Sequence, residues 1–380
     1  MISSFNLCGK FPLKKLGEIT DFLDHLRVPV KSSERVEGSF PYYGANGQQG
    51  TIDNFIFDED LVLLAEDGGN FGNSNRSIAY IARGKYWVNN HAHVLKPRSD
   101  LNLDYLFRVL QFYDVTPFVK GATRAKLNKS DAKRIPIPLP PLEEQHRIVE
   151  LLDRAQALID KRKEQIGLMD QLIQSLFYDM FGDPVTNPKG WEIVPSIKYS
   201  TSIVPGRDKP KSFTGAIPWV TTDDLVHLGR TTVSKKGLGL TGFEIKQVKA
   251  KIIPKSSVIM TCVGDLGVVS INECDMVVNQ QLHAFQCDTN WLNPTFLMYN
   301  LACQTPYMHQ MASSTTVPYM NKKVANNTPT IAPPVELQNT FAERVQQIET
   351  QKQAMTNSLK ELQDNFNSLS QRAFKGELTQ

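Results

Sequence analysis

Apolar residues recur at alternating steps of four and three in two long segments of the chain, residues 148–180 and 341–373. This spacing is the pattern of a coiled-coil helix, because it keeps one apolar stripe facing a partner helix along its whole length. Each segment follows a proline pair, Pro140-Pro141 or Pro333-Pro334. Prolines stop a preceding helix and suit the first turn of a new one. The pattern therefore predicts two long helices, the first on the order of 55–60 Å in length.

The second helical segment repeats the first, 193 residues later. The sequence IPIPLPPLEEQHRIVELLD, which starts at Ile135, returns as TPTIAPPVELQNTFAERVQ, which starts at Thr328. One polar residue interrupts each apolar seam, Arg162 in the first and Lys352 in the second. Two unrelated amphipathic helices would not share one register, so we expect the two helices to pack against each other. The seam residues are Ile148, Leu152, Ile159, Ile166, Ile173, Phe341, Val345, Ile348, Leu359 and Phe366.

Short apolar and β-branched runs dominate the segments that precede the two helices. Runs such as LVLLAED from Leu61 and GVVSIN from Gly267 are bounded by turn residues and predict strands. A helical stretch follows in each segment, near residues 103–113 and 294–303. Each segment therefore predicts a domain that is rich in strands and also contains a helix.

These two segments also resemble each other, more weakly than the helices do. A Val-Asn pair precedes His93 in the first segment and His283 in the second, and GATRAKLNKS from Gly121 is similar to SSTTVPYMNKK from Ser313. The expected fold class is α+β, with two mixed α/β domains related by a pseudo-repeat and separated by the long helices. The expected boundaries are 1–140 for the first domain, 141–185 for the first helix and its linker, 186–332 for the second domain and 333–380 for the second helix.

Composition favours a globular protein with more than one domain. The chain has 380 residues, of which 41% are hydrophobic, and no run approaches the ~20 apolar residues of a membrane helix. The N-terminal residues lack a positive start followed by an apolar stretch, so we expect no secretion signal and a cytoplasmic protein. Five cysteines without a CxxC pair indicate reduced thiols, and we expect no metal site.

Charge is distributed unevenly along the chain. The two β-rich segments carry net charges of +3 and +5, whereas the helical segments carry −4 and −1. Basic residues cluster within 120–134, and again within 207–211 and 246–255. Such clusters on two domains are typical of a protein that binds nucleic acid, although ordinary solvated lysines would give similar local counts. An acidic run within 53–67 would repel phosphates, and we interpret it as a solvated face or a protein contact.

The residues that we expect to contact DNA are polar or basic and lie beside segments that differ between the two copies. In protein–DNA complexes, contacts to phosphates fix the position of the protein, and a few side chains read base edges. The candidates are Thr123, Arg124, Lys126, Lys129, Arg207, Lys209, Thr315, Thr316, Asn321 and Lys322.

Several of these segments resemble one known family over nearly the whole chain. The segments are FPLKKLGEI at Phe11, IPLPPLEEQHRIVELLD at Ile137, LFYDMFGDPVTNPKGWEIV at Leu176 and PPVELQ at Pro333. They are similar to the specificity subunit of type I restriction-modification systems. The second helix departs modestly, because it carries more polar residues than the first.

The resemblance implies two target-recognition domains separated by two long helices packed antiparallel, as in a coiled coil. It implies no catalysis by this chain and no cofactor bound to it; S-adenosylmethionine is expected on a methyltransferase partner. The implied partners are double-stranded DNA with a bipartite asymmetric site, two methyltransferase subunits and translocating endonuclease subunits, with no membrane.

Catalytic interpretations of the sequence are weaker. Asn187-Pro188 lacks the second proline and the aromatic residue with which amino-methyltransferases hold a flipped base. Asp223 or Asp224 with Glu244-Ile245-Lys246 loosely mimics a nuclease metal site, a spacing that is common by chance. We therefore predict no catalytic residues. Two alternatives remain open: a stand-alone bipartite DNA-binding regulator, and a coiled-coil adaptor without a nucleic-acid role.

Overall fold

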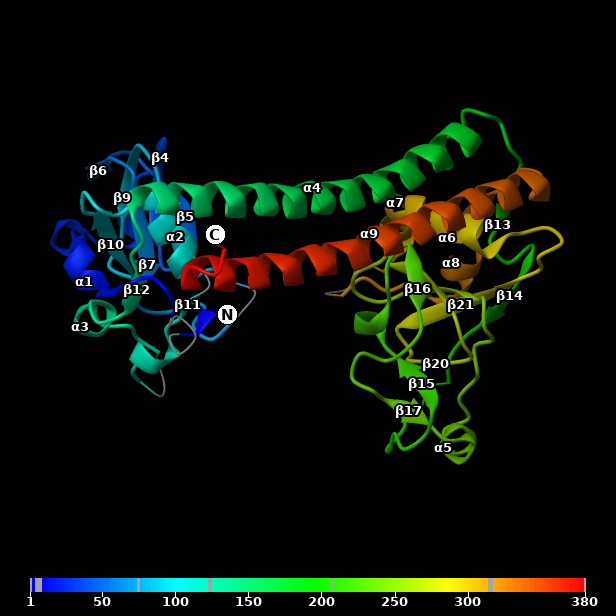
Figure 1. The fold of residues 1–380 in the computed structure, drawn as a ribbon. Helices are drawn as coiled ribbons and strands as arrows, with labels where there is room; N and C mark the ends of the chain where they lie inside the picture. Colours follow the sequence, from blue (N-terminus) through cyan, green and yellow to red (C-terminus); the bar gives the residue numbers. More distant parts are fainter. Residues whose placement is uncertain are drawn as a thin grey trace. The chain divides into compact units, whose positions relative to one another are not determined.

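The computed structural model describes residues 2–3, 9–73, 76–111, 113–121, 125–206, 208–313 and 317–378. It divides into two compact units: unit 1 is Met1–Glu164 with Met355–Gln380, and unit 2 is Gln165–Ala354. Each unit joins one β-rich domain to part of both long helices, α4 (Leu142–Phe181) and α9 (Val335–Lys375) (Figure 1). We call the domain that precedes α4 the first domain and the domain between α4 and α9 the second domain.

The junction after α4 explains why this helix ends where it does. Gly182 has a φ of +77°, a left-handed conformation that glycine adopts without a steric cost, and its amide still bonds the carbonyl of Tyr178 at 2.8 Å. The Lys189 ammonium donates to the carbonyls of Asp179 and Met180 at 2.5 and 3.0 Å. A positive charge at this end also complements the helix dipole. Gly182 and Lys189 together therefore cap the C-terminal end of α4.

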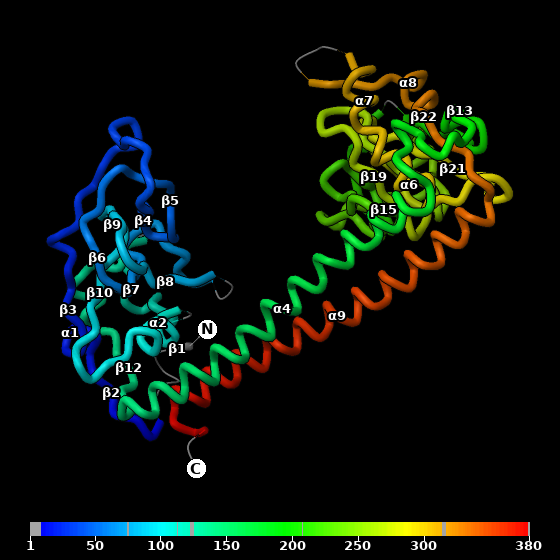
Figure 2. Tube along the Cα trace, turned by 90° about the horizontal axis from the view of Figure 1, so that it is seen from above, coloured from blue at the N-terminus to red at the C-terminus, as the bar shows by residue number. Residues whose placement is uncertain are grey.

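The two long helices pack antiparallel. In unit 1 the beginning of α4 shares a hydrophobic cluster with the end of α9, and in unit 2 the end of α4 shares one with the beginning of α9 (Figures 1 and 2). In unit 2 the rings of Phe177 and Phe341 meet edge to face at 5.5 Å. The α+β fold class with two paired long helices, expected from the repeat, is confirmed.

The first domain contains two four-stranded sheets, ordered β3-β10-β7-β8 and β5-β4-β9-β6, with two-stranded pairs β12-β2 and β1-β11. The helix α2 packs against β7 and β8. Along β7, Val62 and Leu64 point into the cluster shared with α2 and the long helices, whereas Leu61 and Leu63 point into the cluster between the sheets. This alternation with a period of two buries both faces of the strand.

The elements of the first domain are β1 Ile2–Ser3, β2 Leu13–Lys15, α1 Leu16–Ile19, β3 Thr20–Phe22, β4 Phe40–Gly44, β5 Gly47–Ile52, β6 Phe57–Asp58, β7 Leu61–Ala65, β8 Ala79–Ala82, β9 Lys85–Val88, β10 Ala92–Pro97, α2 Leu103–Gln111, β11 Tyr113–Asp114, α3 Lys129–Ala132 and β12 Pro136–Pro138, with 3₁₀ turns η2 Asp24–Leu26, η3 Ser32–Glu34 and η4 Thr116–Phe118.

The second domain repeats this plan with variations. A five-stranded sheet runs β14-β21-β18-β19-β16, a three-stranded sheet runs β17-β15-β20, and β13 pairs with β22. The strand β18 alternates as β7 does: Val258 and Met260 join the cluster with α6 and the long helices, and Ile259 joins the cluster on the other face. In both domains the second sheet contains a parallel pair, β4 with β9 and β15 with β20. The two domains therefore share a scaffold.

The elements of the second domain are β13 Ile193–Pro195, β14 Ser200–Ile203, β15 Ile217–Val220, η5 Thr222–Asp224, β16 Gly229–Thr231, β17 Gly239–Leu240, α5 Gly242–Gln247, β18 Val258–Thr261, β19 Val269–Asn272, β20 Val277–Val278, β21 Leu282–Cys287, α6 Pro294–Cys303, α7 Thr305–Met311, α8 Lys322–Asn326 and β22 Pro329–Ile331. In the described part of the chain, no helix combines the length and apolar character that crossing a membrane requires.

One buried glutamine fixes each domain to the helix that follows it. Gln145 accepts from the amide of Asn102 at 2.7 Å and donates to the carbonyls of Asp100 and Pro140. Gln338, its counterpart in the repeat, accepts from the amide of Asn293 at 2.9 Å and donates to the carbonyls of Trp291 and Pro333. Both side chains are almost fully buried. The same three bonds therefore orient each domain on its helix.

Candidate nucleic-acid interface

Five of the ten DNA-contact candidates lie outside the described residues: Thr123, Arg124, Arg207, Thr315 and Thr316. The other five are described, two in unit 1 and three in unit 2. In unit 1, Lys126 and Lys129 both lie beside one buried carboxylate network. In unit 2, Asn321 and Lys322 lie at the start of α8, whereas Lys209 lies on the segment before β15.

In the first domain, Lys126 lies at the base of a hairpin. Its backbone exchanges two hydrogen bonds with that of Lys120, at 2.9 and 2.8 Å. The next residue, Leu127, donates its amide to the carbonyl of Glu66 at 2.7 Å, which ties the hairpin to the end of β7. The Lys120 ammonium pairs with the nearly buried Asp131 at 2.9 Å.

Two lysines of this hairpin region lie close to buried carboxylates. The Lys126 ammonium lies 3.0 Å from Glu66, and the Lys129 ammonium lies 4.0 Å from Asp24. The side chains of Glu66 and Asp24 are only 11% and 6% exposed. A carboxylate at this distance cancels much of the field that a lysine presents to DNA. Lys126 and Lys129 therefore each have a carboxylate partner inside the domain, which weakens the field that these two lysines present.

The carboxylates belong to a closed network. Arg27 donates to Glu66 at 2.7 Å, and His93 contacts Asp24 through Nδ1 at 2.9 Å and the carbonyl of Leu127 through Nε2 at 2.8 Å. Both ring nitrogens of His93 therefore lie within hydrogen-bond distance of oxygen atoms.

Positive neighbours keep the carboxylates of this network ionised. Burial alone would raise the pKa of Asp24, but the hydrogen bond and charge of His93 hold this pKa below its usual range. The pKa of Glu66 is also lowered, because hydrogen bonds and charges from Arg27 and its neighbours outweigh burial. Asp24, Glu66 and His93 offer ligand atoms within 4.8 Å of one another. Because Arg27 already occupies Glu66, the arrangement fits an ion-pair network rather than a metal centre.

The acidic run within 53–67 divides into exposed and buried residues. Glu66 and Asp67, expected on a solvated face or in a protein contact, are both nearly buried. Asp53 and Asp58 of the same run are exposed. The burial of Glu66 follows from its position directly after the fully buried strand β7, where the chain enters the network of Arg27 and Lys126.

In the second domain, the position equivalent to this network holds uncharged side chains around His283. Asn321 caps α8 by accepting from the amide of Val324 at 3.0 Å, and Lys322 is the first residue of that helix. Beneath them, Nε2 of His283 lies 3.1 Å from both Ser202 Oγ and Asn326 Oδ1. Burial, with a smaller contribution from the nearby charge of Lys322, lowers the pKa of His283 to about 4 despite its hydrogen bond to Asn326. This histidine is neutral at pH 7.

A second group of lysines surrounds α5. The side chains of this group are exposed. Among the residues that the structure describes, none of them has a carboxylate oxygen within 4.0 Å. These residues are Lys209, Lys211, Lys246, Lys249 and Lys251. Their charge is therefore available to an anionic partner, in contrast to that of Lys126.

The two carboxylates that suggested a nuclease site serve as caps. Glu244 accepts from Ser212 Oγ at 2.6 Å and from the amide of Thr241 at 2.7 Å, and these bonds lower its pKa to about 2. Asp224 accepts from the amides of Thr221 and Lys235, both at 2.7 Å. Both carboxylates are bound to backbone and hydroxyl donors rather than pointing together at a shared metal position.

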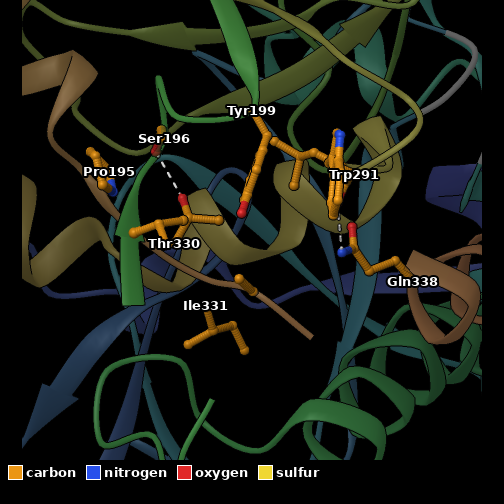
Figure 3. Close-up of a pocket in the computed structure, with 10 residues that line it drawn as sticks. Pro195, Ser196, Tyr199, Trp291, Thr330, Ile331 and Gln338 are labelled. Atoms are coloured by element: carbon orange, nitrogen blue, oxygen red, sulfur yellow. Dashed lines mark hydrogen bonds between the residues drawn. The ribbon is translucent and has the colours of Figure 1, made fainter. Parts of the chain in front are cut away.

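A small pocket in unit 2 lies where the second domain meets the start of α9 (Figure 3). Tyr199 and Trp291 stack at its edge with ring centres 5.6 Å apart, and Ser196 Oγ lies 2.8 Å from Thr330 Oγ1. Its free volume is about 10 Å³, roughly the space of one water molecule. The pocket is therefore a packing gap at a junction and too small for a ligand.

Comparison with known proteins places this geometry in a family. The model of the type I restriction modification DNA specificity domain matches the chain twice, over residues 10–168 and 204–364. A putative type I restriction enzyme specificity subunit of Haemophilus influenzae is 43% identical over 145 residues, which cover 38% of this chain and 37% of that protein. The EcoDI specificity subunit of Escherichia coli is 22% identical over 417 residues, covering 98% of this chain and 90% of that protein.

Two solved structures share the fold. A chain from a study of complex assembly and conformational transition of the type I restriction-modification system has a TM-score of 0.63 at 18% identity, with 97% of this chain and 100% of that chain covered. The S subunit from M. genitalium has a TM-score of 0.55 at 14% identity, with 96% of each chain covered.

Proposed function

Because the chain belongs to the type I restriction-modification DNA specificity family, we propose that each of its two domains reads one half of a bipartite, asymmetric DNA site. The chain is the DNA specificity subunit of such a system, the non-catalytic component. The observation that supports the two-part reading is the shared docking of both domains, in which Gln145 and Gln338 make the same three bonds. Two domains that attach to their helices in the same way but carry different surfaces are well suited to recognise two different DNA sequences.

The partners in this proposal are double-stranded DNA, two methyltransferase subunits and translocating endonuclease subunits. S-adenosylmethionine would be held by the methyltransferase subunits. The negative net charge of both helical segments supports a role in protein contacts rather than DNA contacts. The proposed domain boundaries are those predicted from the sequence, with the second recognition domain at residues 186–332.

The paired helices would set the number of unread base pairs between the two half-sites. In unit 1, Gln156 and Ile159 of α4 line a groove together with Asp364 and Phe366 of α9, so these stretches face each other. Inserting one heptad after Ala155 and one after Asn365 preserves the 4-3 register on both sides. It lengthens the rod by about 10 Å. The unread gap should then grow by up to roughly three base pairs, at about 3.4 Å each.

The measurement is sequencing of methylated bases in the genome of cells that carry each version of the gene. Cells without the gene should lose one split motif, and cells with both insertions should methylate the same half-sequences at a wider spacing. Insertion into α4 alone is the control, and it should abolish methylation because the seams no longer match. A folded double-insertion protein that keeps the original spacing would contradict the role of the helices.

A further inference from the structure

The short helix α5 exposes an aromatic ring. Phe243 is 76% exposed, more than any other large hydrophobic residue that the structure describes. Figure 1 shows α5 beside β15 and β17, at the end of the second domain that lies away from α4 and α9. A single exposed apolar residue is ordinary on a protein surface. The surroundings of Phe243 are not.

The backbone that carries Phe243 is held firmly. The next residue, Glu244, is buried and accepts hydrogen bonds from Ser212 Oγ, Thr214 Oγ1 and the amide of Thr241, at 2.6, 3.1 and 2.7 Å. Ile245 is buried in a cluster with Trp219 and Leu240. The helix therefore cannot turn its aromatic ring inward without breaking these contacts. Phe243 is presented to solvent by a fixed element.

Lysines lie on α5 and on the segments beside it. Lys246 lies three residues after Phe243 and so shares its face of the helix. The bond between Ser212 and Glu244 brings Lys211 beside α5. At the other end, a Cβ on Gly206 would lie 3.1 Å from the carbonyl oxygen of Lys249, so the segment that carries Lys209 runs close to the end of α5. One exposed carboxylate, Asp208, lies on that segment.

The fold does not require this arrangement, because the first domain lacks it. There Phe55 follows the corresponding part of the second sheet and is half-buried, packed on Phe40 at 5.1 Å with the Lys85 ammonium 4.6 Å over its ring. Exposed Asp53 and Asp58 flank it. In the first domain this region therefore has a half-buried aromatic ring beside exposed carboxylates. In the second domain it has an exposed aromatic ring beside lysines.

We propose that Phe243 is an apolar DNA contact of the second domain, inserting its ring at a base step while Lys211, Lys246 and Lys249 hold the neighbouring phosphates. Proteins that insert apolar side chains between base pairs combine such a wedge with basic residues in this way. An ammonium group bound to a phosphate releases counterions, and the ring gains stacking contact with the bases. The inference rests on the proposed function, since it requires the second domain to bind duplex DNA.

The test measures the affinity of the full chain, purified with the subunits that accompany it, for two duplexes of equal length. One carries the motif found by methylation sequencing, and the other has both halves scrambled. Phe243→Ala should weaken binding to the motif duplex roughly ten-fold or more, as loss of a stacking aromatic does, with an unchanged dependence on salt. Lys246→Gln should instead lower the slope of log affinity against log salt by about one.

Two further variants make the result specific. Val233, in the same domain, is 61% exposed, and Val233→Ala should change nothing. Phe243→Trp should retain binding, and the fluorescence of the introduced indole should be quenched by the motif duplex. The proposal is overturned if Phe243→Ala binds within two-fold of wild type, or if it loses an accompanying subunit and keeps its DNA affinity. If wild type does not distinguish the two duplexes, the proposed function fails and this inference fails with it.

Discussion

Lys129 of the first domain and Lys322 of the second occupy the same position in the repeat, yet their neighbours differ in charge. Lys129 lies 4.0 Å from Asp24, which a charged network with His93 and Arg27 keeps ionised. Lys322 lies near a buried, neutral His283 and lowers the pKa of that residue. In the described residues no carboxylate oxygen lies within 4.0 Å of Lys322. Two residues that are alike in sequence therefore present different charge to a ligand.

This difference shows why a count of charges along the chain does not predict which lysines lack a carboxylate partner in the folded protein. In the densest basic cluster of the sequence, within 120–134, the fold places Lys120, Lys126 and Lys129 each beside a carboxylate. The more dispersed lysines around α5 are exposed. Among the described residues, no carboxylate oxygen lies within 4.0 Å of them. We infer that the two domains bind DNA with different balances of charge and shape, the second depending more strongly on ammonium groups.

The largest predicted effect concerns what the two units share. Gln145→Ala and Gln338→Ala each leave one amide and two carbonyls without their partner at a buried junction. Each variant should lose about 2–4 kcal/mol of local stability. Hydrogen exchange at the starts of α2 and α6 measures this loss. Gln346→Ala, on an exposed position of α9, is the control. A large loss in one unit alone would show that the docking is not equivalent.

A pH change should separate the two domains. The unfolded chain protonates His283 near pH 6.5, whereas the folded chain does so near pH 4. The contribution of this residue to stability is therefore complete above pH 6.5 and lost as the pH falls to 4, with about 2 kcal/mol lost between pH 6.5 and 5.

The first domain should respond only at lower pH. The pKa values of Asp24 and Glu66 are lowered, so their contribution disappears only as the pH falls through those low values. Hydrogen exchange of β21 and β10 amides at pH 6.5 and 5, corrected for intrinsic rates, measures the difference. In the His283→Gln variant, the protection of β21 amides from exchange should change little between pH 6.5 and 5. Equal loss in both strands of the wild type would contradict the assignment of a neutral His283.

The smallest effect tests the paired lysines directly. Lys322→Ala should lower the slope of log affinity for duplex DNA against log salt by about one, as loss of a phosphate contact does. Lys126→Ala should lower it by less, because Glu66 already balances that charge. Titrations of both variants at several salt concentrations decide the order. A larger slope change for Lys126→Ala would mean that its pair with Glu66 opens when DNA binds.

The long helices and the repeat were predictable because their signals are local. The 4-3 spacing, the proline pairs and Gly182 lie within a few residues of the structure that they determine. The surface chemistry was not predictable, because its determinants are distant in the chain. Glu66 reaches Lys126 only after β7 has paired with its neighbours, and 60 residues separate the two. A pattern of apolar residues would count Phe243 as core, whereas the structure shows it 76% exposed beside the buried Glu244 and Ile245.

The most direct test of a two-part reader is to exchange one domain and read both halves of the site. Residues 186–332 would be replaced by the corresponding domain of a related specificity subunit, and methylated bases would be sequenced across the genome. We predict a split motif in which one half changes and the other half, with the spacing, stays the same. A change in both halves, or a methylated motif that does not depend on this chain, would contradict the account.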